Sequence, residues 1–233
     1  MAEETMLATE ECVLTIHEKL LDYYGEPQRK QQRDPLDELV VTILSQNTSD
    51  TNSGRAYESL RERFPHWEKV LDADTSEVAD AIRVGGLANV KAKRIQRILE
   101  ELQEERGALS LGFLDEMEVE EARDYLLSLH GVGPKTAACV LLFSLHEPAF
   151  PVDTHVHRVT ERLGLIPEDT STEKAHTLLE ATVPQDIYYA LHLNLIRHGR
   201  TLCTARDPQC HACPLARDCD YAQAHTERLE SPS

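Results

Sequence analysis

A lysine directly after a glycine-rich turn is well placed for covalent chemistry. Lys135 follows the segment 131–134, which reads Gly-Val-Gly-Pro, and the apolar run from Thr136 predicts that a helix begins here. The positive end of a helix dipole disfavours an ammonium group at that position. A neutral amine is the form that adds to carbon and gives a Schiff base. The alternative is a surface lysine that binds phosphate as a point charge.

The turn before this lysine predicts an anion site. Gly131 and Gly133 have no Cβ, so their backbone can approach another backbone closely. Their N–H groups, with that of Lys135, would point outward at a helix start, where a phosphate binds well. The alternative is an ordinary helical hairpin without a ligand.

Four cysteines near the C-terminus have the spacing of a metal site. They are separated by six, two and five residues, at Cys203, Cys210, Cys213 and Cys219. In a chain without signs of secretion, such a group favours a metal centre over disulfide bonds. The spacing alone leaves a structural zinc ion and an iron–sulfur cluster open.

The elements that position the lysine, the glycine turn and the cysteines should be helices. No stretch of the sequence alternates apolar and polar residues as a half-buried strand does. The sequence therefore predicts an all-α protein. Apolar spacing and capping residues predict helices over 6–24, 36–45, 50–64, 75–82, 90–105, 118–129, 136–145, 154–163 and 185–198, and one more that opens with a capping box of Thr170 and Glu173.

The charge balance limits how the protein can meet a polyanion. The 233 residues include 41 acidic and 24 basic side chains, a net charge of −17, which argues against phosphate binding by the whole surface. All charged residues in 83–97 are basic, and acids dominate 100–124. A basic strip that faces nucleic acid and two solvated faces of opposite charge are the alternatives.

No membrane partner is expected. No apolar run approaches the ~20 residues that a membrane span needs. The N-terminus is acidic and lacks the pattern of a signal peptide. We therefore expect a cytoplasmic protein.

Two segments resemble signatures of one enzyme family. Segment 126–136 resembles the helix-hairpin-helix of the endonuclease III family of DNA glycosylases, whose lysine at the position of Lys135 attacks C1′ of a damaged nucleotide and opens the sugar by β-elimination. Segment 150–159 resembles the second signature, whose aspartate, here Asp153, assists the lysine and stabilises positive charge on the sugar. The resemblance implies both as catalytic residues. By its position alone, Asp153 fits a helix N-cap, and the two roles are compatible.

The cysteine spacing equals that of the iron–sulfur loop in the same family. The resemblance therefore implies a [4Fe-4S] cluster as cofactor, held by the four cysteines. In this loop Asp207 stands where a basic residue often helps to grip phosphate, which leaves Arg206 to do so. Pro134 also replaces a common basic residue, so the DNA electrostatics expected from the family are weakened.

Two further DNA contacts follow from the resemblance. Segment 44–50 resembles the part of the family whose glutamine fills the gap left by the extruded nucleotide, which makes Gln46 the plug. Segment 86–89 resembles the loop whose leucine wedges into the duplex, which makes Leu87 the wedge. Extrusion costs a few kcal/mol of unstacking, which a plug and a wedge would partly offset. The alternatives are a helix-end glutamine and a core leucine.

The resemblance covers residues 10–221 and implies a two-lobed helix-hairpin-helix glycosylase fold. Residues 34–147 would form a six-helix barrel with the hairpin, and residues 1–33 would pack with 148–233 as the cluster lobe. Double-stranded DNA with a damaged base or an abasic site would bind in the cleft between the lobes, where Lys135 and Asp153 would meet. The implied function is a base-excision-repair glycosylase with AP lyase activity that removes damaged pyrimidines, acting as a monomer.

Other functions stay open. Segments 43–50, 86–90 and 149–154 also resemble the plant 5-methylcytosine glycosylases, so a mismatched or methylated pyrimidine is an alternative substrate. A glycosylase without lyase activity would use water and would not need Lys135. A noncatalytic helix-hairpin-helix DNA-binding protein, or a zinc-stapled protein without a cluster, would explain one signature but not the others.

Overall fold

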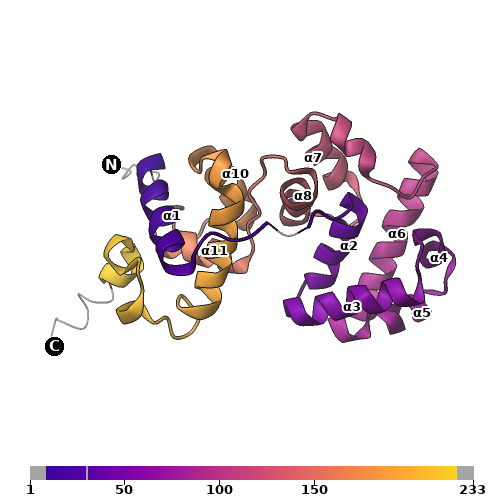
Figure 1. The fold of residues 1–233 in the computed structure, drawn as a ribbon, viewed down its shortest axis with the longest axis horizontal. Coiled ribbons are helices and arrows are strands. Elements are labelled where there is room, and N and C mark those ends of the chain that lie inside the picture. Colours follow the sequence, from indigo (N-terminus) through magenta and orange to yellow (C-terminus); the bar gives the residue numbers. More distant parts are fainter. Residues whose placement is uncertain (1–8, 30, 225–233) are drawn as a thin grey trace. The chain divides into compact units, whose positions relative to one another are not determined.

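The computed structural model describes residues 9–29 and 31–224, which form helices and connecting turns without a strand. The predicted all-α class is therefore confirmed. The chain divides into two compact units (Figure 1): described residues 9–29 with 148–224 make up unit 1, and residues 31–147 make up unit 2. The assignment of 34–147 and of 1–33 with 148–233 as a six-helix barrel and a cluster lobe stays a prediction.

Unit 2 is built around helix α2, which packs against α3, α6 and α8, while α5 packs against α6 and α7 against α8. The helices are α2 Pro35–Ser45, α3 Asp50–Arg63, α4 Trp67–Asp72, α5 Thr75–Ala81, α6 Ala88–Arg106, α7 Val119–Ser128 and α8 Pro134–Val140. Short 3-10 turns cover Arg83–Gly85 and Gly112–Glu116, and a π-helical turn, Leu141–Leu145, continues α8.

The start of α2 shows how the sequence specifies this unit. The Asp34 carboxylate accepts a hydrogen bond from the Leu36 N–H at 2.9 Å, and Pro35 occupies the first helical position, where its missing N–H costs nothing. Leu36, Leu39 and Ile43 repeat at helical spacing and are fully buried. The apolar stripe of α2 is therefore the centre of the unit 2 core.

Unit 1 is built around helix α11, which packs against α1 and α9. The ring of Tyr188 lies edge-on to Phe150, with ring centroids 5.2 Å apart, and both side chains are fully buried. The helices are α1 Glu10–Tyr24, α9 Thr154–Arg162, α10 Thr172–Thr182 and α11 Tyr188–Thr201, with 3-10 turns at Gln185–Ile187, Cys210–Ala212 and Ala216–Asp218.

Several details differ from the sequence prediction. The helix predicted over 185–198 is a 3-10 turn, Gln185–Ile187, followed by α11, Tyr188–Thr201. Helix α4 was not predicted, because its six residues show only two buried apolar side chains. The helix predicted over 136–145 changes to a π turn at Leu141. Ser171, not Thr170, caps α10: the Ser171 hydroxyl accepts from the Lys174 N–H at 3.2 Å, whereas the Thr170 hydroxyl donates to a backbone carbonyl. Residues 6–8 lie outside the described ranges.

A helix that crosses a lipid bilayer must be long and apolar. None of the described helices combines the length and the apolar character that a membrane crossing needs.

Candidate active site and cysteine pocket

The hairpin turn lies in unit 2, between α7 and α8. Gly131 has φ +73°, in the left-handed region that side chains rarely adopt. A Cβ at this position would lie 2.6 Å from Nε of Arg94 in α6. At Gly133 the space is open: a Cβ there would have no atom of residues 9–29 or 31–224 within 4 Å beyond its chain neighbours. The two glycines therefore differ: the first is required by its conformation and its neighbour, and the second leaves the backbone accessible.

Lys135 is the second residue of α8, immediately after Pro134. Its side chain is half-buried, and the helix continues into the wholly buried run from Thr136 to Leu141. The attachment point of the amine is therefore rigid, because the turn and the buried helix both restrain its backbone.

Asp153 lies in unit 1, where it caps α9. Its Oδ1 accepts hydrogen bonds from the N–H groups of His155 and Val156, both at 2.8 Å. The predicted N-cap is therefore observed. Both bonds go to one oxygen, which leaves Oδ2 as the oxygen that can face a substrate. Lys135 belongs to unit 2 and Asp153 to unit 1.

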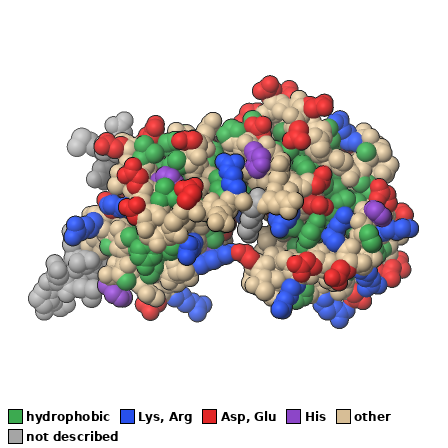
Figure 2. All heavy atoms as spheres, viewed as in Figure 1, with side chains coloured by type: hydrophobic (Ala, Val, Ile, Leu, Met, Phe, Trp, Pro, Cys, Tyr) green, Lys and Arg blue, Asp and Glu red, His purple; other side chains and the backbone are tan. Residues whose placement is uncertain are grey.

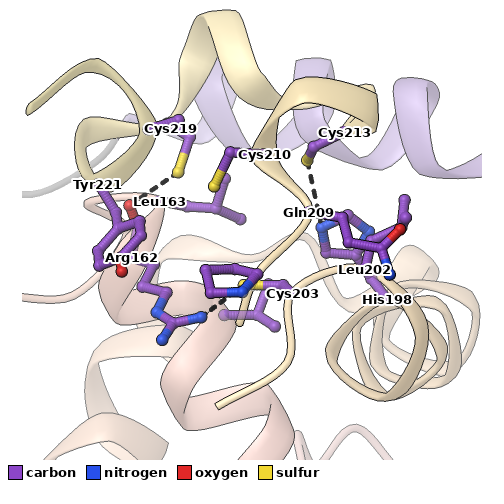
Figure 3. Close-up of a pocket in the computed structure, with 13 residues that line it drawn as sticks. Arg162, Leu163, His198, Leu202, Cys203, Gln209, Cys210, Cys213, Cys219 and Tyr221 are labelled. Atoms are coloured by element: carbon purple, nitrogen blue, oxygen red, sulfur yellow. Dashed lines mark hydrogen bonds between the residues drawn. The ribbon is translucent and has the colours of Figure 1, made fainter. Parts of the chain in front are cut away.

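The four cysteines line one pocket in unit 1, with apolar walls from Val159, Leu163 and Leu202. Figure 3 shows the sulfur atoms of Cys210 and Cys219 pointing into the same space. In the described ranges, no three His, Cys, Asp or Glu side chains converge closely enough to be identified as the ligands of one ion. Four thiols around one apolar pocket are nevertheless a donor set that fits a thiolate-bound metal centre.

Two arginines of α9 bind the segment 203–219 that carries the four cysteines, here called the cysteine loop. Arg162 donates to Cys203 Sγ at 3.3 Å and to the carbonyl of Thr204 at 2.8 Å, and its guanidinium stacks on the Tyr221 ring (Figure 3). Arg158 donates to the carbonyls of Cys203 at 3.1 Å and Gly199 at 2.8 Å. Neither arginine was assigned a role from the sequence. Their spacing of four residues on a helix whose other face is apolar was the available signal.

His198 of α11 lies at the edge of this pocket. Its Nε2 is 3.5 Å from Cys213 Sγ, and its Nδ1 is 3.0 Å from the Tyr24 hydroxyl. Burial lowers the pKa of His198 to about 4, so the ring is neutral near neutral pH. The neutral ring of His198 therefore brings no positive charge to Cys213. Arg162, by contrast, brings a cationic N–H group to Cys203 Sγ.

Burial raises the pKa of three of the thiols. It raises that of Cys213 to about 11, and it also raises those of Cys210 and Cys219. A thiol in such a pocket stays protonated unless a cation compensates the thiolate charge. The pocket therefore suits several thiolates only where a cation such as a bound metal centre compensates their charge.

The plug and wedge candidates both lie in unit 2. Gln46 is the C-cap of α2, half-buried, and its Oε1 accepts from Arg94 Nη1 at 2.7 Å. Leu87 is 55% exposed and adopts φ +49° at the start of α6, so it is not a core leucine. A leucine in the left-handed region is uncommon, and such strain is concentrated at functional sites.

The basic residues of segment 83–97, one of whose two interpretations was a strip facing nucleic acid, do not form a continuous surface. Lys91 is only 2% exposed, and its Nζ donates to the carbonyls of Leu44 at 2.7 Å and Gly85 at 2.8 Å. Arg97 pairs with Glu100 and Glu101. Figure 2 shows acidic and basic side chains interspersed over the visible face of each unit. Arg206 of the cysteine loop is exposed.

The chain is similar to known DNA-repair proteins. Residues 40–185 match the model of the HhH-GPD superfamily base excision DNA repair protein. Endonuclease III of Thermotoga maritima is 32% identical over 195 residues, which cover 84% of this chain and 87% of that protein. A structure of a trapped endonuclease III–DNA covalent intermediate superposes with a TM-score of 0.81 at 28% identity, covering 94% of this chain and all of that one.

Plant relatives are also similar but longer. A candidate DNA glycosylase of Arabidopsis thaliana is 43% identical over 170 residues, which are 73% of this chain and 58% of that protein. The chain thus spans little more than half of this relative and about a tenth of several other plant relatives. From the family match, and from the coverage of the bacterial relative, the chain belongs to the HhH-GPD superfamily of base excision DNA repair proteins and, within it, to the endonuclease III family.

Proposed function

We propose that this protein is a base-excision-repair DNA glycosylase with AP lyase activity on damaged pyrimidines. The observation that carries the proposal is the placement of Lys135 as the second residue of α8, directly after a hairpin turn that requires Gly131. The trapped covalent intermediate of the endonuclease III neighbour supports a reaction in which protein and DNA become covalently joined.

In the proposed reaction, Nζ of Lys135 bonds to C1′ while the bond from C1′ to the base breaks. The base leaves with the electron pair and takes up a proton. The C1′–O4′ bond then breaks, O4′ takes up a proton, and the opened sugar is held to Lys135 as an imine. Loss of a C2′ proton breaks the C3′–O bond, and the 3′ phosphate leaves with that electron pair. Water then hydrolyses the imine and frees the Lys135 amine. Asp153 stabilises the positive charge that develops on the sugar, with Oδ1 fixed by the α9 N–H groups and Oδ2 turned to the substrate.

DNA contacts are proposed for five further residues. Gly131 and Gly133 would offer backbone N–H groups to a phosphate, and exposed Arg206 would add a cation. Gln46 would fill the gap left by the extruded nucleotide, and the exposed, strained Leu87 would wedge into the stack.

We also propose that Cys203, Cys210, Cys213 and Cys219 hold a [4Fe-4S] cluster. A bound cluster would tie the loop to α9 and α11, where Arg162 and His198 already contact two of the sulfurs. Purified protein should be brown and contain about four iron and four sulfide ions per chain. One zinc ion per chain, without sulfide, would instead support the zinc-stapled alternative.

Borohydride reduction on abasic duplex DNA tests the catalytic proposal. Wild-type protein should be trapped covalently, and Lys135→Gln should abolish trapping, because the amide cannot form an imine. Lys69→Gln, at an exposed lysine of α4 in the same unit, is the matched control and should trap normally. Trapping that persists in Lys135→Gln would remove this lysine from the mechanism. Binding without trapping in the wild type would support the noncatalytic alternative.

The substrate is tested separately. Duplexes with thymine glycol, a uracil mismatch, 5-methylcytosine and an abasic site, each assayed with and without borohydride, would distinguish damaged from mismatched or methylated pyrimidines. Release of 5-methylcytosine in preference to thymine glycol would favour the alternative substrate.

A further inference from the structure

The orientation of the Gln46 amide is determined by Arg94. Nη1 of Arg94 donates to Oε1 of Gln46 at 2.7 Å. A guanidinium has donors and no acceptor, so the atom that faces it must be the amide oxygen and not the nitrogen. The Gln46 N–H groups are therefore the part of the amide left for another partner.

The same guanidinium lies against the hairpin turn. A Cβ at Gly131 would be 2.6 Å from Arg94 Nε and 3.1 Å from its Cδ and Cζ. Only a glycine admits the arginine at this distance. Arg94 therefore contacts both the plug candidate at the end of α2 and the turn that precedes the nucleophile candidate on α8.

Helix α6, which carries Arg94, is held firmly on both sides of it. One turn earlier, the buried Lys91 ammonium joins the carbonyls of Leu44 and Gly85. Two turns later, Glu101 Oε2 accepts from the His130 N–H at 2.9 Å. These bonds fix the helix to the α2 end and to the hairpin, so they hold the backbone of Arg94 in place beside both.

We infer that Arg94 is the positioning residue for the plug: it turns the Gln46 amide so that only N–H donors face the gap, and it ties the plug to the hairpin turn. The inference rests on the proposed function, since Gln46 can fill a gap in a duplex only when a nucleotide has been extruded from it. The chemistry that Gln46 then recognises is an acceptor atom on the orphaned base of the opposite strand.

Arg94→Met tests the inference, because it removes the donors and the charge but keeps an unbranched stem against Gly131. Single-turnover base excision from duplex DNA should slow about tenfold, the size expected for one lost charge-assisted hydrogen bond. Arg94→Lys should recover part of the rate through a single donor. Arg63→Met, an arginine of the same unit paired with Glu77 at 3.1 Å, should leave the rate unchanged.

Single-stranded abasic DNA separates positioning from a general structural defect. A single strand has no orphaned base and no gap, so borohydride trapping on it should be the same for the wild type, Arg94→Met and Gln46→Ala. Loss of trapping on single strands by Arg94→Met would mean that the arginine supports the nucleophile site itself, and would overturn the inference.

A double-mutant cycle tests whether Arg94 acts through Gln46. Gln46→Ala with Arg94→Met should excise no more slowly than Gln46→Ala alone, whereas two multiplying effects would overturn the inference. Gln46→Glu keeps an acceptor for Arg94 but has no donor, so it should be as slow as Gln46→Ala; a wild-type rate would overturn the donor assignment. A wild type that neither excises nor traps would overturn the proposed function, which is a distinguishable failure.

Discussion

Asp153 combines a structural and a chemical role that one pair of substitutions can separate. Asn also caps helices well, so Asp153→Asn should retain the hydrogen bonds to the His155 and Val156 N–H groups while losing the charge. Base excision should slow by at least tenfold, whereas the free energy of unfolding should change little. Asp153→Ala should lose both, with about 1 kcal/mol of stability. Wild-type excision by Asp153→Asn would remove the carboxylate from the mechanism.

His17 predicts a pH dependence of stability. It is 7% exposed in α1, its Nδ1 has no hydrogen-bond partner among the described residues, and burial lowers its pKa from 6.5, partly offset by Glu26 and Asp186. The unfolded chain therefore binds a proton near pH 6.5 that the folded chain resists. The contribution of neutral His17 to the free energy of unfolding is therefore full above pH 6.5, and it is lost as the pH falls from 6.5 toward the lower pKa of the folded state.

His17→Leu should flatten this acid-side loss of stability. The measurement is the urea unfolding midpoint between pH 7.5 and pH 5, with His66→Leu as the control at an exposed histidine. Equal slopes for wild type and His17→Leu would show that His17 does not resist protonation in the folded protein.

Single residues also show where sequence reasoning stops. Gln46 and Leu87 were identified from the sequence by the resemblance of segments 44–50 and 86–89 to the endonuclease III family. The partner of Gln46 was not, because Arg94 lies 48 positions away along the chain. Lys91 likewise reads as a surface charge, and only the tertiary packing of α2 and the 83–85 turn around it buries the ammonium.

At the scale of elements, the hairpin turn predicts opposite outcomes for its two glycines. Gly131→Ala forces a side chain into φ +73° and against Arg94, so unfolding should become easier by about 1–2 kcal/mol, and duplex excision should also slow. Gly133→Ala meets open space at φ −106°, so its unfolding free energy should stay within about 0.5 kcal/mol of wild type. Equal destabilisation in urea unfolding would contradict this difference between the two positions.

Helix boundaries were predictable where a capping side chain marks them, as at Asp34, Ser49 and Asp153. Helix boundaries were not predictable where tertiary contacts determine where a helix begins or ends. The short α4 depends on the burial of Trp67 and Val70, and the π turn at Leu141 lies within an unbroken apolar run. Local propensity gives no signal for either, because both depend on packing partners distant in sequence.

At the scale of the whole molecule, the two units should respond differently to loss of the proposed cluster. Cys219→Ser removes one proposed ligand from unit 1, so hydrogen exchange should speed up in α9 and α11 while α2 and α6 of unit 2 keep their protection. Cys12→Ser, a half-buried cysteine of the same unit outside the pocket, is the control. Unchanged exchange in Cys219→Ser would argue against a structural role for the cluster.

The sequence alone predicted the all-α class and the cysteine group, because periodicity and ligand spacing are local properties. The net charge of −17 can also be counted from the sequence. Its consequence for DNA binding cannot, because that depends on which basic side chains are exposed. Lys91 and Arg94 are basic residues used inside unit 2, so counting charges along 83–97 overstates the basic surface. The monomeric state stays a prediction.

The central claim is that Lys135 is the nucleophile, and peptide mapping of the trapped complex tests it most directly. Wild-type protein reduced with borohydride on abasic duplex DNA should be digested and the nucleotide-bearing peptide identified by mass spectrometry. We expect one modified peptide, with the adduct on Lys135. An adduct on another lysine, or no adduct at all under conditions where the DNA is bound, would contradict the claim.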